Sequence, residues 1–169
     1  MFIRKKGNKE SGLTLIELIV AIGIFGLVVT MTVNIFVVAL VSQRRIISLR
    51  NIEDNARFAL ESMAREIRTG KNFGGSISSL SFTNAKGEAI AYRLNNKTIE
   101  KSSDGGANYS VVTGPEVAVD YLNFYLLGQA AGDGLEPRVT ITIGITSQVG
   151  NQVSNTKIQN TISERSLQL

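Results

Sequence analysis

The sequence contains no cysteine, no histidine and no tryptophan, and it has only two prolines. Disulfide bonds, thiol nucleophiles and imidazole bases are therefore excluded, and so are metal sites built from His or Cys. Catalysis by Asp, Glu, Lys or Ser remains chemically possible, but this is a poor inventory for an enzyme. Composition alone therefore argues against an enzyme without excluding one.

The positive charge of the chain is concentrated near its start. Residues 1–12 hold Arg4, Lys5, Lys6 and Lys9 against Glu10, a balance of +3 out of +4 for the whole chain, which leaves +1 for the rest. A nucleic-acid-binding face would need Lys and Arg clustered on the folded part. The charge distribution thus argues against a nucleic-acid partner.

An uncharged run of 24 residues, 18–41, follows this basic segment: LIVAIGIFGLVVTMTVNIFVVALV. As a helix it would be roughly 36 Å long, enough to cross a hydrocarbon core of about 30 Å. The basic residues before it predict a cytoplasmic amino end and an extracytoplasmic remainder. Arg44, Arg45 and Arg50 weaken this signal for orientation, because they follow the other end of the run.

A cleavable secretory signal is the competing interpretation of the apolar run. Such signals have an apolar region of about 7–15 residues that ends at a small-x-small cleavage site. The run here is longer, and the following ALVSQRR offers no good site. The sequence therefore favours a single-pass membrane segment.

The apolar pattern then becomes one-sided, which indicates an amphipathic helix. Its apolar positions recur every three or four residues: Leu49, Ile52, Ala56, Ala59, Met63 and Ile67. No proline interrupts residues 13–69, and Gly70 is a plausible C-terminal stop. We predict one helix of about 57 residues, roughly 85 Å long, whose second half needs a partner surface.

The remaining residues alternate in hydrophobicity as strands do. The pattern is present at Leu80/Phe82, at Ile90/Tyr92/Leu94 and in the segments PEVAVDYLNFYLL and RVTITIGI. Turn residues lie at 84–87 and 95–96. The segment TKIQNTISERSLQL is a weakly patterned last strand. The predicted fold is α+β, with an antiparallel sheet packed on the amphipathic half of the helix.

Glu17 is the unexpected residue, because a carboxylate stands at the edge of a lipid-compatible segment. A local explanation exists: Thr14-x-x-Glu17 has the spacing of a capping box, in which each side chain satisfies a backbone donor at a helix start. Glu17 also lies only about 6 Å along the helix from Leu13, close enough to reach the membrane interface.

The stretch GLTLIELIVAIGIF resembles the cleavage and methylation signature of type IV prepilins and type II secretion pseudopilins. The resemblance covers about the first 30 residues. It implies that a prepilin peptidase cuts between Gly12 and Leu13 and N-methylates Leu13. It also implies that Glu17 pairs with the Leu13 amine of a neighbouring subunit, and so sets the register of assembly.

Two features depart from the commoner pattern of the family. The first mature residue is Leu13 rather than Phe, and Asn34 stands where major pilins often carry a proline. The absence of cysteine excludes the disulfide-bounded C-terminal loop of many Gram-negative major pilins. NARFALESMAREIRTGKNF followed by a β-rich region resembles, more loosely, J-type minor pseudopilins and related minor pilins.

Two Asp-containing loops, SSDGGAN and GDGLEP, are either calcium loops, as major pseudopilins have, or simply turns. Two Gly-rich turns with one Asp each are more typical of turns. We therefore predict no metal site for them.

These patterns predict four regions: a leader (1–12), a transmembrane and assembly half-helix (13–41), an amphipathic half-helix (42–70) and a β-rich domain (71–169) that packs with it. The resemblance implies a minor pilin or pseudopilin of a secretion pseudopilus or pilus-like filament, a structural subunit with no catalysis of its own and no cofactor. Its partners would be a prepilin peptidase, other pilin subunits and the cytoplasmic membrane. After assembly it would lie in a periplasmic or cell-surface filament. The alternatives are a competence or adhesion pilin that contacts DNA or a surface, and a single-span anchored domain that does not assemble.

Overall fold

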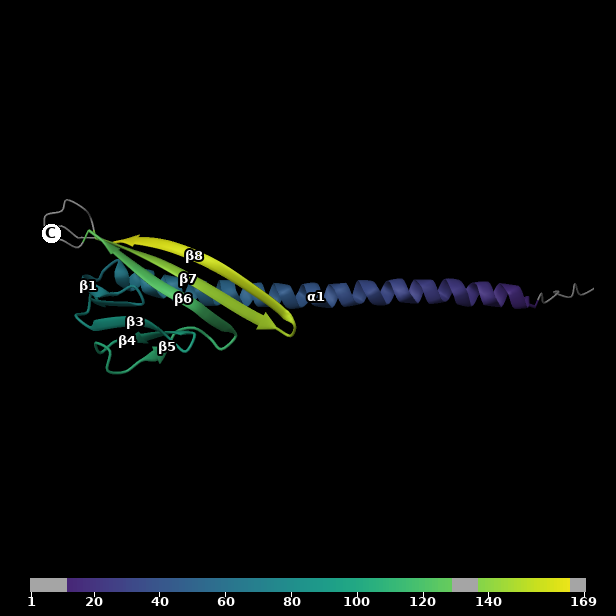
Figure 1. The fold of residues 1–169 in the computed structure, drawn as a ribbon, viewed down its shortest axis with the longest axis horizontal. Coiled ribbons are helices and arrows are strands. Elements are labelled where there is room, and N and C mark those ends of the chain that lie inside the picture. Colours follow the sequence, from purple (N-terminus) through teal and green to yellow (C-terminus); the bar gives the residue numbers. More distant parts are fainter. Residues whose placement is uncertain (1–11, 129–136, 165–169) are drawn as a thin grey trace, which may run out of the picture. The chain divides into compact units, whose positions relative to one another are not determined.

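A computed structural model describes residues 12–128 and 137–164 of the chain. In these residues one helix, α1 (Leu15–Ile67), precedes the strands (Figure 1). The strands are β1 (Lys71–Ser76), β2 (Ser79–Thr83), β3 (Ala89–Asn95), β4 (Thr98–Ser102), β5 (Ser110–Val111), β6 (Val117–Leu127), β7 (Arg138–Val149) and β8 (Gln152–Ser163). The chain divides after Ser42 into two compact units, which we describe separately. The α+β fold predicted from the sequence is confirmed.

Helix α1 has 53 residues and is slightly shorter than predicted. It begins at Leu15 rather than Leu13, because Thr14 acts as the N-cap: its side-chain oxygen accepts a hydrogen bond from the Glu17 backbone N–H at 3.3 Å. At the other end the chain leaves the helix after Ile67 through a tight turn, in which the N–H of Gly70 donates to the carbonyl of Ile67.

Glycine is needed at position 70, but not for the helix C-cap conformation that the sequence predicted. Its φ is not in the left-handed region that a glycine C-cap would occupy. A Cβ atom at position 70 would instead lie 2.6 Å from the ring of Phe82. Glycine is therefore required by the close packing of the turn against β2.

One stripe of α1 within the second unit is buried, and it forms the spine of the core. The buried positions are Ser48, Ile52, Ala56, Ala59, Leu60, Met63 and Ile67. Five of the six predicted apolar positions are thus confirmed. The prediction for Leu49 was wrong, since its side chain is 38% exposed. The inward position of that turn is Ser48, whose hydroxyl donates to the carbonyl of Ser147 on β7 at 2.8 Å.

Strands β1 to β5 form an antiparallel sheet in sequential order. Four of the inward residues predicted from alternation are buried, Leu80, Phe82, Ile90 and Tyr92. Leu94 is only partly buried against the core, and Ile99 of β4 is buried although it was not predicted. The turn between β3 and β4 places Asn96 and Lys97 at positive φ, as a two-residue hairpin of the primed type requires. The Gly-containing strand β1 was not predicted, because KNFGGS lacks both alternation and β-branched residues.

Strands β6, β7 and β8 form a second antiparallel sheet with longer strands. Val139, Ile141, Ile143 and Ile145 of β7 are at most 1% exposed, which confirms the predicted alternation. The last strand begins at Gln152, earlier than its weak pattern indicated, and it pairs with β7 over its whole length. Gly150 opens the two-residue turn of this hairpin with φ of +59°.

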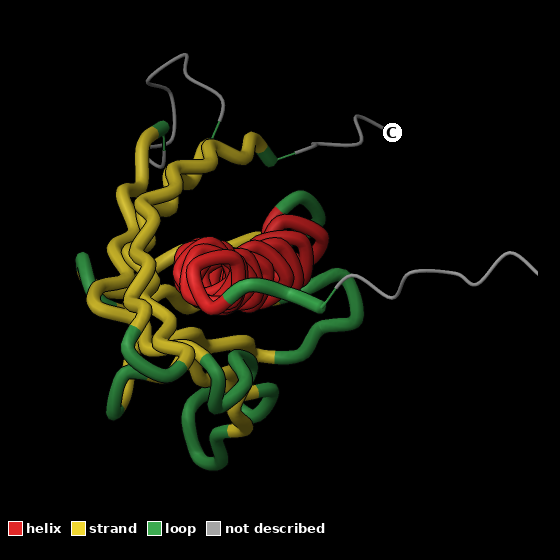
Figure 2. Tube along the Cα trace, turned by 90° about the vertical axis from the view of Figure 1, so that its right-hand side faces the viewer, coloured by secondary structure: helices red, strands yellow, loops and turns green. Residues whose placement is uncertain are grey.

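The two sheets meet along β6, where the sequence had predicted one sheet. The backbone N–H groups of Phe124 and Val119 donate to the carbonyls of Ile77 and Lys97, at 2.7 and 2.8 Å. Turns of the first sheet thereby cover the outer edge of β6. Figure 2 shows the strands of the second unit on more than one side of the helix. Residues from α1 and from both sheets contribute to a single hydrophobic cluster.

We expect Met63→Ala to destabilise the second unit strongly. The Met63 side chain lies on the buried side of α1 and is 0% exposed. Truncating a buried Met to Ala costs about 2–5 kcal/mol of stability. Phe58→Ala is the matched control on the same helix, because Phe58 is 62% exposed and should change the free energy of unfolding by less than about 0.5 kcal/mol. Denaturant unfolding of the full chain in detergent measures both values. Equal effects of the two substitutions would contradict the assignment of the buried stripe.

Candidate processing and assembly site

Gly12 and Leu13 lie just before the helix, and both are exposed. A Cβ atom added at Gly12 would meet no atom within 4 Å, and its backbone does not need the left-handed region. The fold of this chain therefore gives no reason for glycine at position 12. Close approach of an external molecule to the peptide bond is a reason, because a side chain there would obstruct it.

Thr14 and Glu17 stand at the N-cap and N3 positions of α1. One half of the predicted capping box is present, the hydrogen bond from the Glu17 N–H to the Thr14 hydroxyl. Within residues 12–128 and 137–164, the hydrogen bonds and salt bridges do not include the Glu17 side chain. A carboxylate in the first turn is favourably placed for the helix dipole. The Glu17 carboxylate is exposed and thus available to a cation outside the chain.

The first part of α1 is long and apolar enough to span a membrane, by length and composition. All residues from 15 to 42 are exposed, including apolar side chains on every face of the helix. Thr30 and Thr32 satisfy their hydroxyls within the helix, by donating to the carbonyls of Gly26 and Val28 at 2.8 Å. These two hydroxyls are therefore compatible with lipid.

Residues 7–33 match the family described as the prokaryotic N-terminal methylation motif. The match includes Gly12, Leu13, Thr14 and Glu17 and the start of the apolar helix. No curated protein and no protein of solved structure matches the chain significantly. Together with the α+β fold, the motif supports a type IV pilin-like or pseudopilin subunit, and the apolar helix fits a membrane-anchored, single-pass protein.

A second group of polar side chains connects α1 to the first sheet, and it was not predicted. Tyr92 of β3 donates to Glu66 at 2.7 Å, and Lys101 of β4 forms a salt bridge with the same carboxylate. Burial raises the pKa of Tyr92 well above its usual range, and the Glu66 carboxylate raises it further. Tyr92 therefore remains a neutral donor, and the group has a structural role. Tyr92 and Lys101 are 26 and 35 positions away from Glu66 in the sequence. Residues so far apart form no local pattern from which this group could have been predicted.

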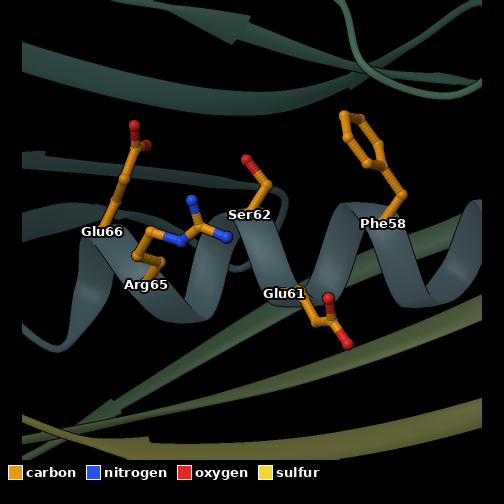
Figure 3. A pocket seen from close by; sticks show the side chains of 5 residues that line it. All are labelled: Phe58, Glu61, Ser62, Arg65 and Glu66. Atoms are coloured by element: carbon orange, nitrogen blue, oxygen red, sulfur yellow. The ribbon is translucent and has the colours of Figure 1, made fainter.

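Glu66 also lines a small hollow on the exposed side of α1, shown in Figure 3. Phe58, Ser62 and Glu66 point to the same side of the helix, and Glu61 points away from them. The volume of about 170 Å³ is below the 300–1,000 Å³ usual for small-molecule sites. This hollow is therefore not a candidate substrate pocket.

The first Asp-containing loop is a turn stabilised by its own carboxylate. Asp104 accepts hydrogen bonds from the backbone N–H groups of Ala107 and Asn108, at 3.0 and 2.9 Å, and from the side chains of Ser102 and Asn108. The bonds from Asn108 and Ser102 hold the pKa of the Asp104 carboxyl well below its usual range. The second loop, GDGLEP, lies almost entirely outside the described residues. Among the described residues no cluster of three or more His, Cys, Asp or Glu could hold a metal ion.

We predict that Asp104→Asn removes a pH-dependent part of the stability. Because the folded-state pKa of Asp104 is lowered, its contribution is present above the unfolded value of about 4 and is lost as the pH falls through the folded value. Thermal unfolding of the full chain should separate wild type from variant at pH 7, and the difference should shrink below pH 4. Asp54→Asn, at an exposed position of α1, is the matched control. A difference that is independent of pH would contradict this role.

We predict that co-expression with a prepilin peptidase removes residues 1–12 and adds one methyl group to the amine of Leu13. Mass spectrometry of the amino terminus measures both changes. Gly12→Val should block cleavage, because the side chain obstructs the peptide bond, whereas Gly7→Val should leave it intact. An uncut chain under these conditions, or cleavage after Val41, would contradict the assignment of the site.

Proposed function

We propose that the chain is a minor pilin or pseudopilin, a structural subunit that packs by the first part of α1 into a pilus-like filament. The observation that carries the proposal is the constellation Gly12, Leu13 and Glu17 immediately before an apolar helix that has no covering partner within residues 12–42. A chain with this constellation is prepared for processing and for contact with other helices. It needs no catalytic residues of its own.

Two glycines in the apolar helix support packing against other helices. A Cβ atom added at Gly23 or Gly26 would meet no atom within 4 Å apart from the backbone of the helix itself, so the chain alone does not require glycine at either position. Glycine inside a helix costs about 1 kcal/mol relative to alanine. Small residues on apolar helices allow close approach of a neighbouring helix in lipid. Their presence in this segment is consistent with contacts made only after assembly.

Glu17 supplies the charged contact of the proposed assembly. Cleavage after Gly12 creates a cationic amine at Leu13, four residues from Glu17 and next to the apolar segment. In a bundle of such helices, the carboxylate of one subunit can neutralise the amine of the next. Removing one member of a buried pair leaves the other charge uncompensated, which costs about 3–5 kcal/mol. The pair therefore favours one register between neighbouring helices.

The finer assignment rests on the second unit. The J-type resemblance of residues 55–73 is consistent with a subunit of low abundance in a type II secretion pseudopilus. These residues include Ala56, Ala59, Met63 and Ile67 of the buried stripe, so much of the resemblance lies in positions that pack against the sheets. We place the second unit on the extracytoplasmic side of the cytoplasmic membrane, in agreement with the basic leader.

We predict that Glu17→Gln is inserted and cut normally but is recruited poorly to neighbouring subunits. If Glu17 only caps its own helix, glutamine retains most of the hydrogen bonding and the change is less than about 1 kcal/mol. If it neutralises a neighbouring amine, crosslinking in the membrane should fall at least tenfold, because a stranded charge costs more than about 1.4 kcal/mol. A photo-crosslinker at Val20 reports recruitment, and the mass of the amino terminus reports processing.

Glu53→Gln is the matched control for charge on the same helix, because Glu53 is exposed in the second unit. It should be processed and crosslinked as the wild type is. Normal crosslinking of Glu17→Gln would return Glu17 to a local capping role. Absence of crosslinks from the wild-type chain would instead favour an anchored domain that does not assemble.

A further inference from the structure

A polar groove lies between α1 and the start of β8. It is lined by Arg45 and Leu49 of the helix and by residues 152–155 of the strand, and its volume is about 350 Å³. Arg44 lies next to it, because a Cβ atom at Gly150 would be 3.2 Å from the Arg44 guanidinium. We call Arg44, Arg45, Leu49 and residues 150–155 the arginine groove. All of these residues belong to the second unit.

The arginine groove is positively charged, and the two segments that form it contain no acidic residue. Residues 42–52 and 147–157 contain no Asp or Glu, but they contain Arg44, Arg45, Arg50 and Lys157. Within residues 12–128 and 137–164, neither Arg44 nor Arg45 forms a salt bridge. Both arginines are exposed. The groove therefore presents guanidinium groups to an anion from outside the chain.

Apolar side chains are exposed beside these arginines. Ile46 and Ile47 on α1 are 50% and 48% exposed, and Val153 on β8 is 61% exposed. Exposed aliphatic residues interleaved with arginine are typical of surfaces that lie at a membrane interface, where apolar groups meet the acyl boundary and cations meet the headgroups. A site for a soluble anion would not require them.

The position in the sequence gives the same indication. Arg45 follows the last residue of the uncharged run, Val41, by four positions in a continuous helix, which is about 6 Å along the axis. If residues 18–41 span the bilayer, Arg44 and Arg45 lie at the depth of the phosphate layer. Lys and Arg are usually more frequent on the cytoplasmic flank of a membrane helix than on the extracytoplasmic flank. Arg44, Arg45 and Arg50 at this end are therefore unexpected, and their presence requires a specific explanation.

We propose that the arginine groove binds the phosphate headgroup of an anionic phospholipid on the extracytoplasmic side of the membrane. The planar guanidinium groups match phosphate oxygens in paired hydrogen bonds. Gln152 and Asn155 are among the residues that line the groove, and amide side chains of this kind can donate further hydrogen bonds. Bound in this way, the β7–β8 turn is held against the membrane surface while the subunit awaits assembly.

The proposal rests on the membrane anchoring in the proposed function but not on filament assembly. It can be tested on the full chain alone, reconstituted in nanodiscs of phosphatidylcholine with increasing phosphatidylglycerol. The chain has no cysteine, so Asn151→Cys, at an exposed turn position, accepts a single environment-sensitive fluorophore. Failure of processing or crosslinking would overturn the proposed function, whereas this assay reports only contact between the turn and the headgroups.

We expect the fluorophore to respond to phosphatidylglycerol and each of the two arginines to strengthen the response. Each basic residue near an anionic surface contributes about a fivefold change in the binding constant. Arg44→Gln or Arg45→Gln should therefore raise the phosphatidylglycerol fraction at half response by about fivefold. The pair Arg57→Gln and Arg68→Gln, at exposed positions on the same helix and just after its end, is the matched control and should leave the half response unchanged.

Three results would overturn the proposal. The first is an equal signal in neutral and anionic nanodiscs. The second is an equal loss in the control variants, which would mean that only the net charge matters. The third is the same signal with inorganic phosphate in neutral nanodiscs, which would make the groove a site for a free anion. If the groove instead serves a neighbouring subunit, the signal will depend on added pilins and not on lipid.

Discussion

The buried stripe of α1 is the contact on which the second unit depends. Five apolar side chains, Ile52, Ala56, Ala59, Met63 and Ile67, are at most 1% exposed, and residues of both sheets pack in the same cluster. Each sheet has an inward apolar face that would otherwise contact water. Because the stripe ends near Ser48, the helix has a covered half and an uncovered half in one continuous element. This change along a single helix separates the folding role of the chain from the role in assembly that we propose for it.

The uncovered half of the helix imposes a different constraint. Its apolar side chains need lipid or other helices, and the residues that do not suit a simple anchor are the ones that suit assembly. The described fold does not require glycine at position 12, and the Glu17 carboxylate has no hydrogen-bond partner among the described residues. A membrane anchor alone would require neither residue. The proposed cleavage by a peptidase and the proposed pairing with a neighbouring amine would together explain both.

Much of the fold could be predicted from the sequence, because one-sided burial leaves a periodic pattern. The stripe of α1 and the inward residues of β2, β3 and β7 follow directly from periods of 3.6 and 2. The division into two sheets could not be predicted, since alternation does not reveal which strands pair. Strand β6 pairs with β7 and contacts the first sheet only through its turns at Ile77 and Lys97. Leu49 was misplaced because a buried serine, Ser48, faces β7 and an apolar residue faces outward. Strand β8 is an edge strand of mostly polar residues, so its sequence lacks the apolar alternation from which its first residue could have been predicted.

The candidate site was predictable to a different degree. Gly12, Leu13 and Glu17 were found by their order and spacing before an apolar run, which needs no tertiary structure. Their roles in processing and assembly remain predictions. The arginine groove could not be found in this way, because Arg45 and Gln152 are brought together only by the packing of β8 beside α1. The sequence showed the arginines only as a conflict with the expected charge bias.

The central claim is that this chain is a processed subunit of a filament. The most direct measurement is mass spectrometry of filaments sheared from cells that express the chain with its native partners. The account predicts that the filament fraction contains this chain with an amino terminus at N-methylated Leu13, in smaller amount than the main subunit. Recovery of the chain only in the membrane fraction, with residues 1–12 still attached, would contradict the account.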